Sequence, residues 1–219
     1  MRSGRAHLCA LVTCVALALA FAGPATAATP PTVPDVILGG HLYPKPYGLA
    51  YTYGQVRVPL GSTQPVSNQT VTLYQSVYPF TGWAPVATLT TDFGGYFSFH
   101  ESITQNIAFR AVWNGVVSKD KLVKLPMRVS MKARRSGRSV IFRGTSFPLL
   151  VGRVVELQRL SRHGGFHTFA KVQITGSKGY ESRIRMKGGG VFRALAPADG
   201  QYSVGASRPV RVRAMAKKK

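Results

Sequence analysis

Side chains that could act as acids, bases or metal ligands are few in this sequence and widely spaced. His163 and His167 have the four-residue spacing of zinc ligands, but that spacing serves a helix, and here it crosses a glycine-rich hairpin. His100 and Glu101 end an expected strand, where a solvated edge is a simpler interpretation than a general base. Asp92 opens a glycine-rich stretch and predicts a turn, with calcium binding as a weaker alternative. We therefore expect no catalytic residue, no metal site and no cofactor, and a hydrolase would need His100, Glu101 or Asp92 to converge in one pocket.

Lysine and arginine are the more informative residues, because the chain carries 29 of them against 7 acidic residues, a formal net charge of +22. The excess is uneven. Residues 28–126 contain 6 basic and 4 acidic residues, whereas residues 127–219 contain 21 basic and 3 acidic residues, a net charge of +18. An asymmetry of this size indicates a polyanionic partner for the second half. The alternative is a solvated surface whose cations protect sheet edges, and it accounts poorly for the difference between the halves.

Strand parity is expected to place many of these cations on exposed faces. Arg183, Arg185 and Lys187 alternate with apolar residues such as Ile184, so the basic side chains are expected to face solvent. Residues 134–138 are expected to form a basic turn. The predicted polyanion-binding residues are Arg128, Lys132, Arg134, Arg135, Arg138, Arg183, Arg185, Lys187, Arg211 and Arg213.

The candidate partners outside a cell are anionic polymers or anionic surfaces of the cell envelope, namely teichoic acids, acidic polysaccharides and anionic lipids. Nucleic acid would satisfy the same electrostatics, but the basic strands carry no interleaved aromatic residues for stacking bases. A protein partner is the remaining option.

Residues 1–27 are expected to be a signal peptide. Arg2 and Arg5 give a basic start, residues 8–22 form an apolar run too short to span a bilayer comfortably, and residues 25–27 offer small residues for cleavage. A retained membrane anchor is the alternative, but small residues and prolines follow the run instead of a basic stop. Both cysteines lie in this segment, so the mature chain is predicted to contain no disulfide. It is also predicted to contain no membrane span, because no later run is long and apolar enough. Secretion without disulfides is more typical of bacteria than of an animal extracellular space. We therefore expect a secreted bacterial protein that is associated with the cell surface.

After a Pro-rich linker over residues 28–46, with a short strand at residues 36–38 as an option, the pattern is β throughout. The expected strands cover residues 69–74, 84–89, 96–100, 107–113 and 116–125 in the first half, and 139–143, 153–160, 168–174, 180–187, 191–195 and 210–214 in the second. Short strands at this spacing predict an all-β fold. We expect two tandem seven-stranded, Ig-like β-sandwich domains over residues 47–126 and 127–219, the second ending in a lysine tail.

The two halves repeat one another at a nearly constant offset, which drifts only in the final loop. We interpret the matched apolar residues as core, with Trp83 and Phe166 at one end of each core; exposed ligand-stacking roles for Trp83 and Tyr96 are the alternative. The matches are residues 54–61 with 137–144, Val71 and Leu73 with Val155 and Leu157, Trp83 with Phe166, Gly95 and Tyr96 with Gly179 and Tyr180, Phe109 and Ala111 with Phe192 and Ala194, and Ser118 with Ser207.

In this order, the motifs resemble the tandem immunoglobulin-like β-sandwich repeats of secreted bacterial proteins. The glycine-aromatic hairpin is also similar to that of carboxypeptidase-regulatory-like modules. The resemblance covers about residues 47–214 and implies adhesive, spacer or binding modules outside the cell. The second half departs from the pattern, because Phe166 replaces the tryptophan and residues 176–179 lack the aspartate.

Together these features predict a secreted, non-enzymatic protein whose basic second domain associates with the cell envelope or its anionic polymers. The alternative is a structural spacer or an adhesin-type protein-binding module without polyanion specificity.

Overall fold

The structure is a computed structural model that describes residues 33–43, 47–176 and 178–215. Its regular elements are all β-strands, which confirms the expected fold class. Within the described ranges, no helix is long and apolar enough to cross a membrane. The predicted signal peptide, with both cysteines, and the lysine tail at residues 217–219 lie outside the described residues.

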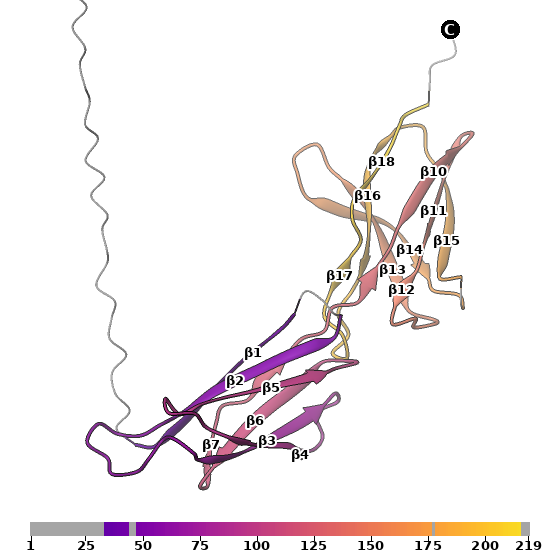
Figure 1. Cartoon of the computed structure of the whole chain (residues 1–219). Coiled ribbons are helices and arrows are strands. Elements are labelled where there is room, and N and C mark those ends of the chain that lie inside the picture. The colour runs from indigo at the N-terminus through magenta and orange to yellow at the C-terminus, as the bar shows by residue number, and fades with distance from the viewer. Residues whose placement is uncertain (1–32, 44–46, 177, 216–219) are drawn as a thin grey trace, which may run out of the picture. The chain divides into compact units, whose positions relative to one another are not determined.

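Strands of the first half form a β-sandwich of two antiparallel sheets (Figure 1). One sheet has the order β1-β2-β5, and the facing sheet has the order β4-β3-β6, with β7 and β8 both pairing with β6. The strands are β1 (Asp35–Leu42), β2 (Leu49–Arg57), β3 (Thr70–Val77), β4 (Ala84–Thr90), β5 (Tyr96–Ser102), β6 (Ile107–Trp113), β7 (Val116–Val117) and β8 (Lys121–Val123).

The first strand, β1, lies within residues 28–46, which the sequence predicts to be a linker. It pairs with β2 over its full length and packs three inward-facing apolar side chains, Val36, Leu38 and Leu42, against the core. Residues 35–42 are therefore a strand and not a linker, and this strand extends the short one offered at residues 36–38 in both directions. Three inward-facing side chains and a full ladder of backbone hydrogen bonds hold an edge strand that the prolines around it conceal in the sequence.

The second half builds the same arrangement again (Figure 1). One sheet has the order β10-β11-β15, the facing sheet has the order β14-β13-β16 with β17 and β18 on β16, and β9 pairs with β12. The strands are β9 (Arg128–Val129), β10 (Lys132–Ser136), β11 (Ser139–Gly144), β12 (Ser146–Phe147), β13 (Val154–Leu160), β14 (Phe166–Gln173), β15 (Tyr180–Arg185), β16 (Gly190–Ala196), β17 (Gly205–Ala206) and β18 (Val210–Val212).

Strands β3 and β13 confirm the repeat at the valine-x-leucine motif. Leu73 pairs with Ala111 of β6, and Leu157 pairs with Ala194 of β16; all four side chains are fully buried. A bulge follows each leucine on the side that faces the edge strand. Because a bulge redirects a strand, a bulge at the same position means that both strands follow the same path.

The strand beyond β6 or β16 is split in two by a serine. β7 and β8 pair with opposite ends of β6, and β17 and β18 do the same with β16. In each gap the serine hydroxyl accepts a hydrogen bond from a strand amide, Ala111 N to Ser118 Oγ and Ala194 N to Ser207 Oγ, both at 2.9 Å. When β7 and β8 are counted as one strand, and β17 and β18 likewise, the two facing sheets of each sandwich have the seven strand positions expected. The short pair β9-β12 is additional in the second half.

The predicted glycine-tyrosine match is wrong by one position. Tyr96 is 55% exposed, whereas Tyr180 is 1% exposed. The ladders pair Gly54 with Phe97 and Gly144 with Tyr180, and an added Cβ would collide with the Phe97 ring or with the Tyr180 hydroxyl. Phe97 and Tyr180 therefore occupy one position in the two sandwiches, and Gly54 corresponds to Gly144.

This register also corrects the predicted alignment of residues 54–61 with residues 137–144. The hydrogen bond from Asp92 N to Tyr96 O corresponds to the one from Thr175 N to Gly179 O. By this bond Tyr96 aligns with Gly179, not with Tyr180. The predicted match of the two glycines holds within the turns, because Gly95 N and Gly179 N each donate to the carbonyl three residues before, of Asp92 and of Gly176, and both glycines have a positive φ. A one-residue difference in register moves every side chain to the other face of the sheet.

The aromatic residues next to β4 and β14 lie outside the core. The Trp83 ring is 4.1 Å from the Arg110 guanidinium carbon, and the Phe166 ring is 4.1 Å from that of Arg193. Both arginines stand on the solvent side of their sheets, between inward-facing neighbours. The predicted core position of both rings is wrong, because each is half-buried under a cation on the outer side of its sheet.

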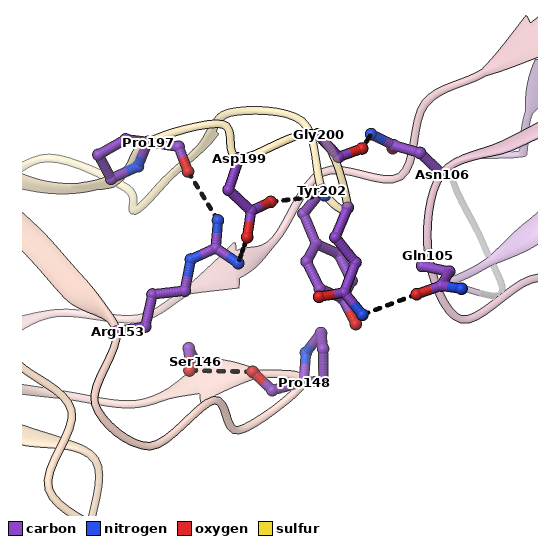
Figure 2. A network of polar contacts seen from close by, with 10 residues as sticks. Gln105, Asn106, Ser146, Pro148, Arg153, Pro197, Asp199, Gly200 and Tyr202 are labelled. Atoms are coloured by element: carbon purple, nitrogen blue, oxygen red, sulfur yellow. Dashed lines mark hydrogen bonds and ion pairs between the residues drawn. The ribbon is translucent and has the colours of Figure 1, made fainter. Parts of the chain in front are cut away.

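The junction between the two sandwiches is packed around Pro126. Leu125 and Met127 are buried on either side of this proline. The buried Asn106 side chain accepts a hydrogen bond from Leu125 N at 2.7 Å. It also donates one to Gly200 O at 2.6 Å (Figure 2). One amide thus satisfies backbone groups from both sandwiches.

An ion pair orders the loop that carries Gly200. Arg153 pairs with Asp199 and donates to Pro197 O at 3.1 Å, while Asp199 accepts from Tyr202 N at 2.8 Å (Figure 2). Burial alone would raise the pKa of Asp199, but the hydrogen bonds from Arg153 and from the Tyr202 amide hold this pKa below its usual range. The carboxylate is therefore charged at neutral pH and holds the loop against the junction.

Candidate functional site

One face of the sheet β10-β11-β15 gathers five basic side chains. Directly paired residues of antiparallel strands point to the same side of a sheet. Val140 and Phe142 point into the core, so the residues between them point to solvent together with their partners on the neighbouring strands. We call this outer side the basic face; it carries Lys132 and Arg134 of β10, Arg143 of β11, and Arg183 and Arg185 of β15.

Ile141 is the apolar base of the basic face. It points outward between Arg134 and Arg183, its direct partners in the ladders, yet it is only 6% exposed. The aliphatic stems of its neighbours therefore cover it, and their charged ends are held above an apolar floor. Beside it is a shallow hollow of about 280 Å³ lined by Lys132, Ala133, Arg134, Ile141 and Arg143.

The basic face includes one acidic residue. Glu181 pairs with Arg143 at 2.9 Å, and both side chains are more than half exposed. An exposed ion pair of this kind contributes little to stability. Five basic residues and one acidic residue leave the face with a net charge of +4, which attracts an extended anion.

The structure corrects the predicted turn at residues 134–138. Arg134 and Arg135 belong to strand β10, and only Gly137 and Arg138 lie between β10 and β11. Arg134 stands on the basic face, whereas its neighbour Arg135 points to the other side of the sheet. Lys132 and Arg134 continue the outward parity of Arg128 and Ser130, but residues 134–138 contain no apolar side chain that would mark the core side of the strand.

Arg135 uses all three of its guanidinium nitrogens within the sandwich. They donate to Met186 O at 2.9 Å, to Gly188 O at 2.7 Å and to Arg213 O at 2.9 Å. The first two carbonyls follow β15, and the third follows β18 of the facing sheet. Arg135 therefore clamps the ends of two strands from different sheets.

Other predicted anion-binding residues lie away from the basic face. Arg211, in β18, and Arg213, just after it, are exposed on the outer side of the facing sheet. Arg128, in β9, lies over the Tyr47 ring at 4.2 Å. Tyr47 itself donates to Pro126 O at 2.8 Å, so this arginine packs at the junction.

Two further predicted residues border the basic face. Arg138 is exposed in the turn beside β11, and Lys187 is exposed shortly after the end of β15. Arg143 is a member that sequence reasoning missed. The sequence contained a signal for it, since Arg143 has the opposite parity along β11 to the core residues Val140 and Phe142.

The corresponding sheet of the first sandwich carries rings where the second carries cations. On the outer side of β1-β2-β5, His41, Tyr51 and His100 form one cross-strand row, flanked by Tyr43 and Tyr53. Tyr51 stacks on His100 with 4.7 Å between ring centroids and lies 5.4 Å from both His41 and Tyr53. The Tyr43 hydroxyl is 3.3 Å from His100 Nε2. We call these five residues the aromatic face; sequence reasoning missed it because they come from separate segments.

The residues with acid–base potential do not converge on one site. Asp92 Oδ1 accepts hydrogen bonds from Gly94 N at 2.8 Å and Tyr96 N at 2.9 Å, so its carboxylate closes the turn. His100 points to solvent, whereas Glu101 points to the opposite side of the sheet, where burial raises its pKa. Among the residues that the structure describes, no three His, Cys, Asp or Glu side chains are grouped so that they could hold a metal ion.

The chain matches no family model and no curated protein. Among solved structures it is similar to a tetra-tandem repeat in the extending region of a large adhesion protein, at 13% identity and a TM-score of 0.35 over 82% of this chain and 48% of that chain. It is also similar to the BSP domain of a biofilm-associated protein, at 16% identity and a TM-score of 0.27 over 83% of this chain and 29% of that chain. The chain spans less than half of either structure, and TM-scores of this size carry no argument about function.

Proposed function

We propose that this chain is a secreted, non-enzymatic protein that associates with an anionic polymer of the bacterial cell envelope through the basic face. The single observation that carries the proposal is the gathering of five basic side chains, against one acidic one, on one side of one three-stranded sheet. A flat, open face suits an extended polymer, because neighbouring charges can contact successive anionic groups of one chain.

The second supporting observation is that the charge is held in place. Arg183 donates to Ser136 Oγ at 3.1 Å, and Ile141, which is paired with both Arg134 and Arg183, is only 6% exposed. Cations that are already ordered lose less conformational entropy when they bind a ligand. The face is therefore better prepared for an anion than the same number of free lysines would be.

The test removes three charges from the basic face. In the triple variant Arg134→Ser, Arg183→Ser and Arg185→Ser of the full chain, we expect weaker binding to immobilised heparin. The dependence of log affinity on log salt should also flatten by on the order of one unit for each cation removed, because fewer counterions are released. Titrations between low and physiological salt measure both quantities.

The matched control removes the same charge from the facing sheet. Lys171, Arg211 and Arg213 are exposed on or beside β14 and β18, and their triple change to Ser should leave most of the affinity and the salt slope intact. Equal losses in both variants would mean that net charge, not the basic face, drives binding. Absence of wild-type binding to heparin and to purified wall polymer at low salt would refute the proposal.

A structural spacer or adhesive module is the second candidate, and the packed junction favours it. Leu125, Met127 and Asn106 are buried between the sandwiches, which is an arrangement suited to transmitting position or force. This role predicts normal folding and attachment in the triple variant of the basic face. The two candidates are therefore separated by the same set of proteins.

A further inference from the structure

The aromatic face and the basic face occupy the same position in the two sandwiches. Because the ladders align Gly54 with Gly144, equivalent rows can be read directly across the two sheets. The row of His41, Tyr51 and His100 corresponds to the row of Arg134, Ile141 and Arg183. The repeat thus presents one surface twice, once with rings and once with cations.

We infer that the aromatic face is a second binding surface, and that it takes the sugar rings of a polysaccharide. The inference rests on the proposed function and narrows its ligand from any anionic polymer to an acidic polysaccharide. Such a polymer carries carboxylate or sulfate groups for the basic face and carbohydrate rings for the aromatic face.

Tyr53 shows that the ring surface is built into the sheet. A Cβ added to Gly39 would lie 2.5 Å from Tyr53 Cζ, so the ring lies across β1 in the space that Gly39 leaves. Tyr53 remains 45% exposed, and its ring is tilted by 30° from that of Tyr51. The pair offers apolar ring surface with hydroxyl groups at its rim, which matches the C–H faces and hydroxyls of a sugar.

An open groove of about 570 Å³ continues from these tyrosines toward the edge where β5 approaches β4. Rings and polar groups line it together, which is the mixture of contacts that a carbohydrate chain requires. The groups that line it include Tyr51, Tyr53 and Tyr96 together with Thr90, Asp92 and Ser98.

The aromatic face lacks the excess positive charge that a nucleic-acid or polyphosphate site would need. Arg57, at one corner of the same side of the sheet, pairs with Asp35 at 2.9 Å. Asp92 adds a negative charge to the groove. A phosphate backbone therefore gains no net attraction here, whereas ring contacts with a sugar do not depend on charge. These observations favour a polysaccharide over other polyanions.

The experiment uses the full chain with Tyr51→Ala and Tyr53→Ala combined, and three probes: polygalacturonate, hydroxyethyl cellulose and polyphosphate. We expect the affinity for polygalacturonate to fall by at least about tenfold, because the loss of one stacking ring has an effect of about that size and two are removed. The affinity for polyphosphate should stay unchanged. Phe80→Ala, which removes an exposed ring from the loop between β3 and β4, is the control and should behave as wild type.

The three probes separate this inference from the proposed function. If the wild type bound neither polyanion, the proposed function would be refuted, and with it the assignment of an acidic polysaccharide. Binding of the wild type to hydroxyethyl cellulose, with loss of that binding in the tyrosine variant, would still support the aromatic face as a saccharide surface. Unchanged binding of both polysaccharides by the tyrosine variant, or an equal loss for polyphosphate, would overturn the inference and leave the face to a protein partner.

Discussion

One serine hydroxyl in each sandwich takes the place of a backbone group in a sheet ladder. Ser118 and Ser207 are buried, and each satisfies a central alanine amide where the neighbouring strand is interrupted. Each hydroxyl also donates to the next backbone carbonyl at 3.1 Å. The strand can therefore break without leaving a buried amide unpaired, a defect that costs roughly 1–3 kcal/mol.

Replacing either serine with alanine should expose that cost. Ser118→Ala and Ser207→Ala are each expected to lower the free energy of unfolding by about 1–3 kcal/mol, measured by urea titration of the full chain. Thr63→Ala, in an exposed loop, provides the control for hydroxyl loss alone. A serine variant as stable as the control would show that water or a shifted strand can satisfy the amide.

At the scale of elements, Arg135 joins the two sheets of the second sandwich. Its guanidinium contacts carbonyls that follow β15 and a carbonyl that follows β18, at an end of the sandwich where the strands stop. Hydrogen bonds from a charged donor are stronger than those between neutral groups. The neighbouring residue, Arg134, is also an arginine but points to the opposite side of the sheet. A comparison of the two therefore distinguishes a structural role from a ligand-binding role.

Arg135→Met should destabilise the end of the sandwich where β15 and β18 stop, and should leave anion binding by the basic face unchanged. We expect a loss of about 1–3 kcal/mol in unfolding free energy and faster hydrogen exchange at the Met186 amide, which bonds to Arg138 O at 3.0 Å. Arg134→Met should have the reverse profile, with unchanged exchange and weaker heparin binding. Equal heparin defects in the two variants would contradict this division.

The sequence predicted the elements best where core alternation is strict. Val71 and Leu73 of β3, like Phe109 and Ala111 of β6, alternate inward, and both motifs recur in register. The relative alignment of β5 and β15 was wrong by one residue. The two preceding turns differ in composition, so that Phe97 lies opposite Gly54 and Tyr180 lies opposite Gly144. Only the pairing of Gly54 with Phe97 reveals that alignment, and such pairing belongs to the tertiary structure.

At the scale of the molecule, the two sandwiches share one continuous core through the junction. Buried side chains run from the first sandwich through Leu125 and Met127 into the second. Asn106 adds hydrogen bonds to Leu125 N and Gly200 O within that core. A junction of this kind predicts that the sandwiches unfold together.

The two tryptophans make this prediction measurable. Trp83 and Trp113 both lie in the first sandwich, so their fluorescence reports on that half, whereas far-ultraviolet circular dichroism reports on both. The two unfolding curves should coincide in the wild type and separate in Asn106→Ala, which should also lose about 1–3 kcal/mol. Gln105→Ala, which removes a more exposed contact with Gln201, is the control. Separate curves in the wild type would contradict the coupling.

The candidate site was only partly within reach of the sequence. Parity along β15 identified Arg183 and Arg185, because Ile184 between them marks the core side. The aromatic face escaped, because His41, Tyr51 and His100 meet only through the pairing of three strands. A single tyrosine or histidine in a strand carries no sign of its neighbours, whereas a charge excess is visible in composition alone.

The register that places Phe97 of β5 and Tyr180 of β15 at one position has a consequence for folding fidelity. Tandem copies of one fold can exchange strands while they fold. If β5 replaced β15 beside β11, Phe99 would face Phe142, and Glu101 would face the fully buried Val140, positions now held by Ser182 and Ile184. An extra ring and a buried carboxylate would both penalise the exchanged core. The two sheets thus differ on their inner faces as well as on their outer ones, and this difference predicts that each copy folds with its own strands.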